Sequence, residues 1–125
     1  MRRKIYDKLV NWKNKPERMP LIVNGARQVG KSHILKEFGE REFDKYIILN
    51  LEIDKALREK FEDDLTPKSL IQYLESAHSK RIMPNKTLII FDEIQACERA
   101  LTALKYFCEQ TPEYHIAAAG SLLGV

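Results

Sequence analysis

The residues from Gly25 to Ser32, written GARQVGKS, place two glycines, a lysine and a hydroxyl side chain at the spacing G-x-x-x-x-G-K-[ST]. In such a loop successive backbone N–H groups converge on a phosphate, because glycine leaves room where a side chain would block the approach. An apolar run, 21–24, precedes the loop, and a stretch with helical apolar spacing follows it. The sequence therefore predicts a phosphate-binding loop between a strand and a helix, rather than an incidental glycine turn.

The residue types in this loop indicate separate roles in binding a nucleotide. We expect Lys31 to neutralise the β- and γ-phosphates and Ser32 to offer its hydroxyl to Mg²⁺. The helix that follows aims its N-terminal N–H groups at the same anion. His33 opens that helix and is a candidate contact, while packing or solvent exposure is an equal alternative. The predicted nucleotide-binding residues are Gly25, Ala26, Arg27, Gln28, Val29, Gly30, Lys31, Ser32 and His33.

A second signal is the acidic pair Asp92 and Glu93, which closes the apolar run LIIF at 88–91. A buried strand rarely ends in two acids unless a cation or a polar group lies there. We expect Asp92 to hold Mg²⁺ and Glu93 to polarise or orient an attacking water. Capping of the helix that starts near Ala96 would explain one of the two acids but not both.

The elements that must position these residues alternate along the chain. Short apolar runs predict strands at 21–24, 45–52, 87–93 and 114–120. Strands that alternate with helices predict an α/β fold with a parallel sheet and helices on both faces. In such sheets ligands bind at the carboxyl ends of the strands, where the loop and the acidic pair would meet.

The helices are predicted from apolar stripes and capping residues. A helix over 1–15 has the stripe Ile5, Leu9 and Trp12, and a second runs from the loop to a C-cap at Gly39. Asp54 is expected to cap a short helix, and Thr66-Pro67 to start another that ends near Lys80. The last helix is expected to bury the stripe Cys97, Leu101, Leu104, Cys108.

Composition bounds the class of protein. The chain has 125 residues, enough for one domain, with 44% apolar and 31% charged residues. No apolar run approaches the ~20 residues of a membrane span, and two cysteines without metal spacing indicate a reducing compartment, so we expect a cytoplasmic protein. Residues 1–20 hold seven Lys or Arg and two acids. Such a leader could contact nucleic acid or an acidic partner, but a solvated helix face is the favoured interpretation.

GARQVGKS, FDEIQ and AAGSLLGV together resemble a family of prokaryotic AAA-type P-loop ATPases over nearly the whole chain. The resemblance implies a three-layer P-loop NTPase fold with strand order 5-1-4-3-2, and ATP and Mg²⁺ as cofactors. It implies Lys31 and Glu93 as catalytic residues and Ser121 as a polar sensor after the fourth strand. Gln95 matches the glutamine of the family's acidic motif, with no defined role. Ala119 stands where many relatives have Thr.

The length departs from that family, whose members usually run to several hundred residues. The sequence stops after the fourth predicted strand, so we expect 1–125 to be the N-terminal part of an ATPase domain, without strand 5 or an arginine finger. An arginine finger is worth roughly 10³–10⁵ in rate, so weak turnover is expected. The expected function is ATP binding and Mg²⁺-dependent hydrolysis coupled to an unknown C-terminal effector.

Two alternatives stay open from the sequence. One is a nucleotide-binding switch or scaffold with little turnover, and the other is a nucleic-acid-associated module based on the basic leader. Besides ATP or ADP, the expected partner is a second copy of the chain, paired through the uncovered edge of strand 21–24. No membrane partner is expected, and the sequence identifies no particular protein or DNA partner.

Overall fold

Four parallel strands form the centre of the molecule. The structure, a computed structural model, describes residues 2–15, 21–24 and 31–120; of Arg2, Arg3, Asn24, Lys31 and Ser32 it describes the backbone alone. The strands are β1 (Leu21–Asn24), β2 (Lys45–Asn50), β3 (Thr87–Asp92) and β4 (His115–Gly120), in the spatial order β1-β4-β3-β2. All pairings are parallel. This confirms the predicted order 1-4-3-2 of the P-loop NTPase-like fold.

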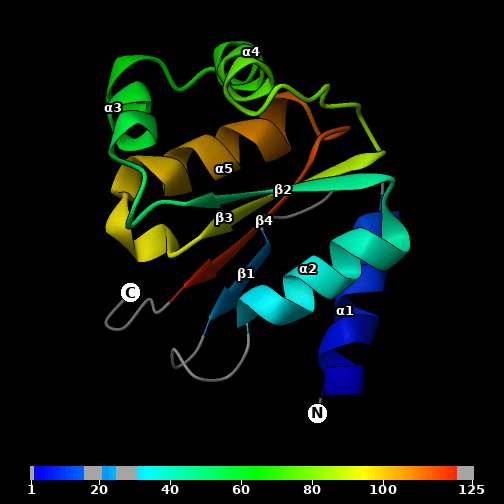
Figure 1. The fold of residues 1–125 in the computed structure, drawn as a ribbon. Coiled ribbons are helices and arrows are strands. Elements are labelled where there is room, and N and C mark those ends of the chain that lie inside the picture. The colour runs from blue at the N-terminus through cyan, green and yellow to red at the C-terminus, as the bar shows by residue number, and fades with distance from the viewer. Residues whose placement is uncertain (1, 16–20, 25–30, 121–125) are drawn as a thin grey trace.

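Helices cover both faces of the sheet, which makes three layers (Figure 1). One face carries α1 (Arg2–Asn14) and α2 (Lys31–Glu42). The other carries α3 (Lys55–Asp63), α4 (Pro67–His78) and α5 (Glu98–Gln110). The 3-10 turn η2 (Ile94–Ala96) joins β3 to α5. In the described ranges, no helix has both the length and the apolar character needed to cross a bilayer.

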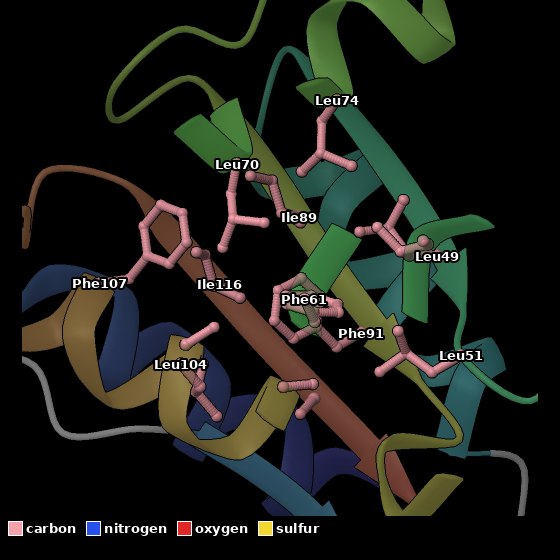
Figure 2. Packing of buried hydrophobic residues seen from close by; sticks show 14 of the residues in the cluster. Leu49, Leu51, Phe61, Leu70, Leu74, Ile89, Phe91, Leu104, Phe107 and Ile116 are labelled. Atoms are coloured by element: carbon pink, nitrogen blue, oxygen red, sulfur yellow. The ribbon is translucent and has the colours of Figure 1, made fainter. Parts of the chain in front are cut away.

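Each face of the sheet has its own hydrophobic core. The α3–α5 core is the larger and is built on inward-facing residues such as Leu49, Phe91 and Ile116 (Figure 2). Phe61 of α3 meets Phe91 edge to face, with ring centroids 5.7 Å apart. The α1–α2 core lies on the opposite side and contains Leu9, Trp12, Ile34, Leu35, Phe38, Phe43, Leu88, Ile90, Ala117 and Ala119. Burial on both sides explains why β3 and β4 are continuously apolar rather than alternating.

The stripe predicted for the first helix is wrong at its start. Leu9 and Trp12 are buried, but Ile5 is 39% exposed. Tyr6 takes the inner position instead: its ring meets Phe38 edge to face, and its hydroxyl donates a hydrogen bond to Glu42 Oε2 at 3.0 Å. Burial, and then the hydrogen bond to the Glu42 carboxylate, raise the pKa of Tyr6 to about 12.

Gly39 does not end its helix as predicted. It lies inside α2, which continues to Glu42, and it is buried against β2. A Cβ at this position would lie 2.7 Å from Cβ of Tyr46. The glycine is therefore explained by the close approach of α2 to β2 and not by a left-handed cap.

The stripe predicted for the last helix is rotated by about one residue. Cys97 and Leu104 are buried as expected, but Leu101 and Cys108 are only half-buried. The inner face of α5 is completed by Ala100, Ala103 and Phe107. The small alanines let the helix approach the sheet, and a stripe drawn through the larger apolar residues misses them.

The remaining helix boundaries agree closely with the sequence. Asp54 caps α3 as predicted, with its side chain accepting a hydrogen bond from Leu57 N at 3.0 Å. Thr66 occupies the N-cap of α4, but its side chain makes no capping bond. The end of α4 comes at His78, with Ser79 in a left-handed conformation, two residues before the predicted end.

Candidate functional site

The carboxyl ends of all four strands lie at one edge of the sheet. The parallel register places Asn24 beside Gly120, and Asn50 beside Asp92. Figure 1 shows that the first turn of α2 begins at this same edge, next to the end of β1. A helix N-terminus, the last residues of four strands and their turns therefore surround one region. This is where parallel α/β sheets bind ligands.

Asp92 is the last residue of β3 and is half-buried. Its backbone carbonyl accepts a hydrogen bond from Leu51 N at 3.0 Å, which joins the ends of β2 and β3. Its carboxylate Oδ1 accepts from the backbone N–H of Glu93 at 3.0 Å. The carboxylate is thus held at the strand end by the backbone that follows it.

Glu93 has a left-handed backbone, with φ 54° and ψ 49°. This conformation costs a residue with a Cβ roughly 1–2 kcal/mol, and it turns the chain sharply from β3 into η2. The next residue, Ile94, is completely buried in the α3–α5 core, which fixes the turn from its far side. The half-buried Glu93 side chain accepts a hydrogen bond at Oε1 from Gln95 Nε2, at 2.8 Å.

Gly120 ends β4 directly beside this turn. A Cβ on Gly120 would overlap Oε1 of Gln95 and would lie 3.1 Å from both Cγ2 and N of Ile94. The glycine is required by this contact. The tips of β3 and β4 are therefore packed together through the η2 turn.

The exit of β2 is held by Asn50, which the sequence analysis did not single out. Its Oδ1 accepts from the backbone N–H groups of Glu52 at 3.0 Å and Ile53 at 3.3 Å, a turn that asparagine favours. Arg58 of α3 donates to the carbonyls of Leu51 at 2.6 Å and Glu52 at 2.7 Å. Glu52 itself is exposed at this edge. The available signal for this turn was the asparagine that directly follows the apolar run 46–49.

The predicted site residues fall in and outside the described ranges. Asp92 and Glu93 are described and adjacent, and His33 is exposed in the first turn of α2. Lys31 and Ser32 begin α2, but only their backbone is described. The positions outside the described residues are Gly25, Ala26, Arg27, Gln28, Val29, Gly30 and Ser121. No group of three or more His, Cys, Asp or Glu that could hold a metal occurs in the described part of the chain.

Asp92 fits a magnesium ion better than a metal whose ligands must all come from the protein. Mg²⁺ prefers oxygen ligands, keeps several waters, and is usually bound by one or two carboxylates together with substrate phosphates. A single half-buried carboxylate at the strand end matches this pattern.

A hollow of about 780 Å³ lies elsewhere, along β2, and is lined by residues including Lys36, Asp44 and His78. Asp44 and Lys45 stand at the opposite, amino-terminal end of β2. This hollow does not include the carboxyl ends of the strands. The chemistry therefore places the candidate site at Asp92 and Glu93 rather than in this hollow.

Comparison with known proteins identifies a family. A family model described as an AAA domain matches residues 17–125. The matched range begins before β1 and includes every strand, the GARQVGKS loop and the acidic pair. No curated protein matches the chain.

Proposed function

The chain belongs to the AAA domain family, and on this premise we propose that it binds ATP with Mg²⁺ through residues 25–32 and hydrolyses it with Glu93. A domain of this family is a P-loop ATPase-like, nucleotide-binding domain. The observation that carries the proposal is the acidic pair at the tip of β3. It stands at the same sheet edge as the start of α2, the helix that follows GARQVGKS.

Nucleotide binding is assigned to the loop and the start of α2. Backbone N–H groups of 25–30 and the N-terminus of α2 are suited to the phosphates. Lys31 would neutralise the β- and γ-phosphates. Ser32 and Asp92 would hold Mg²⁺, which when bound draws charge from the phosphate oxygens.

Hydrolysis is assigned to Glu93. Its carboxylate would accept a hydrogen bond from a water, orient it in line with the γ-phosphorus, and take its proton. The water oxygen then bonds to phosphorus while the bond to the β-phosphate oxygen breaks, giving ADP and inorganic phosphate. Ser121, after β4, would be the polar side chain that contacts the γ-phosphate.

Calorimetric titration with Mg-ATP tests the binding part. Lys31→Ala should weaken binding about tenfold or more, since a charge-assisted hydrogen bond contributes roughly 1.5–3 kcal/mol. Lys36→Ala is the matched control, because Lys36 is an exposed lysine on the same helix. Equal affinity of wild type and Lys31→Ala would refute binding through this loop.

Phosphate release under single-turnover conditions tests hydrolysis. Glu93→Gln keeps the size and hydrogen-bonding capacity of the side chain but removes its charge. It should spare affinity and slow release by roughly 10²–10⁴, the usual contribution of a positioned acid–base group. Glu40→Gln, at an exposed glutamate of α2, is the control. Nucleotide binding without release above background would instead assign the chain to the switch alternative.

A further inference from the structure

The Gln95 side chain joins the Glu93 carboxylate to the tip of β4. Its Nε2 donates to Glu93 Oε1 at 2.8 Å, and its Oε1 lies close enough to Gly120 that a Cβ there would overlap it. The two ends of one amide therefore contact two strand ends. Gln95 is half-buried and belongs to η2, whose first residue, Ile94, is anchored in the α3–α5 core.

These contacts restrict Glu93 at both its backbone and its side chain. The backbone is left-handed, and its N–H is bonded to Asp92 Oδ1. With Oε1 bonded to Gln95, the second carboxylate oxygen, Oε2, has a defined direction. A carboxylate that must orient a water benefits from such restriction, because a displacement of 1 Å at a reacting group can cost about 10²-fold in rate.

We propose that Gln95 is a positioning residue for the hydrolysis assigned above: it holds Oε1 of Glu93 so that Oε2 faces the attacking water, and Gly120 provides the space it occupies. The inference rests on the proposed function. In this role the amide acts through Glu93.

The first test replaces the amide by an apolar group of similar size. Gln95→Leu should lower the single-turnover rate of phosphate release about tenfold to a hundredfold and leave the Kd for Mg-ATP within about twofold. Gln72→Leu is the matched control, since Gln72 is an exposed glutamine of α4 on the far side of the α3–α5 core. An unchanged rate in Gln95→Leu overturns the inference.

The second test asks whether Gln95 acts through Glu93. In the Glu93→Gln background, Gln95→Leu should have no further effect on the rate, because the carboxylate that it positions is gone. The double substitution Glu93→Gln, Gln95→Glu keeps an amide–carboxylate pair with the charge transposed. It should bind Mg-ATP and stay as slow as Glu93→Gln. A Gln95→Leu effect of equal size in both backgrounds would show that the residue is merely structural.

A third measurement does not depend on turnover. In an NMR spectrum the side-chain amide protons of Gln95 should be shifted by the hydrogen bond, and Glu93→Ala should abolish that shift. Amide resonances that are insensitive to Glu93→Ala overturn the inference whatever the rates. A wild-type chain that neither binds Mg-ATP nor releases phosphate overturns the proposed function and the role of Gln95 together. Binding and release with an unaffected Gln95→Leu overturns the role of Gln95 alone.

Discussion

The two ends of the same four strands are built differently. At the amino end, polar groups are buried and used in packing: His115 is 2% exposed, lies edge-on to Trp12 and Phe43, and shares a 3.2 Å contact between its Nε2 and the Lys13 carbonyl. At the carboxyl end, Asp92, Glu93 and Gln95 are half-buried. Hydrogen bonds there join Glu93 N to Asp92 Oδ1 and Gln95 Nε2 to Glu93 Oε1. One end joins the helices to the sheet, while the other holds acidic groups in fixed directions at the cost of a strained backbone.

The comparison predicts that changes at the amino end affect stability and changes at the carboxyl end affect function. The largest stability effect is expected for Trp12→Ala, because Trp12 is buried in the α1–α2 core next to Phe38 and His115. Truncating a buried aromatic residue costs about 3–5 kcal/mol. Ile5→Ala, at an exposed position of the same helix, should cost less than about 0.5 kcal/mol. Urea denaturation measures both, and a loss below 1 kcal/mol for Trp12→Ala would contradict the packing described for α1.

Adding one methyl group at Gly120 or at Gly39 should distinguish the functional role of one end of the sheet from the packing role of the other. Gly120→Ala overlaps Gln95 Oε1 and presses on Ile94, so it should cost about 1–3 kcal/mol as overpacking does and also slow phosphate release. Gly39→Ala meets Tyr46 Cβ at 2.7 Å, away from the acidic pair. It should lower stability by a similar amount while release in the folded protein stays unchanged. If both substitutions slowed phosphate release equally, the claim that only the carboxyl end of the sheet affects function would be wrong.

Because the backbone of Glu93 is left-handed, a glycine there should give a more stable protein than an alanine, which is the reverse of the usual order. Glycine adopts this conformation without the steric cost, so Glu93→Gly should be more stable than Glu93→Ala by about 0.5–1 kcal/mol. At Gln72, inside α4, the alanine variant should be more stable than the glycine variant by about 1 kcal/mol. Thermal or urea unfolding of the four variants measures the two differences. Equal stability of the two Glu93 variants would show that no strain is stored at the acidic pair.

A further expected effect concerns Tyr6 and is pH-dependent. Tyr6→Phe removes the hydrogen bond to Glu42 and should cost about 0.5–1.5 kcal/mol at pH 7. The fold raises the pKa of Tyr6 from 10.0 to about 12, so the neutral phenol is favoured in the native state. Its contribution is complete below pH 10 and is lost as the pH rises from 10 to 12. The difference between wild type and Tyr6→Phe should therefore shrink over that range, and a constant difference would contradict the raised pKa.

The strands could be predicted from the sequence because buried parallel strands are uninterrupted apolar runs, and Asp92 and Glu93 stood out because they follow one such run. The strand order came from the family resemblance and not from these runs. It missed features that depend on partners distant in the chain. Gly39 was interpreted as a cap because its neighbour Tyr46 is invisible in a local pattern. The bond from Gln95 to Glu93 depends on the left-handed turn, which in turn follows from the burial of Ile94. The loop 25–30 and Ser121 stay predictions.

The place of β1 in the sheet has a consequence for how the protein is made. Among the described strands β1 is paired with β4 alone, Leu21 beside Ala117 and Asn24 beside Gly120. The α3–α5 core draws its buried residues from 47–118, whereas the α1–α2 core needs residues from both Leu9 and Ala119. A ribosome releases β1 long before β4, so β1 stays without this strand partner until β4 emerges. Contacts so distant in sequence form slowly. β1 is therefore translated early and paired late.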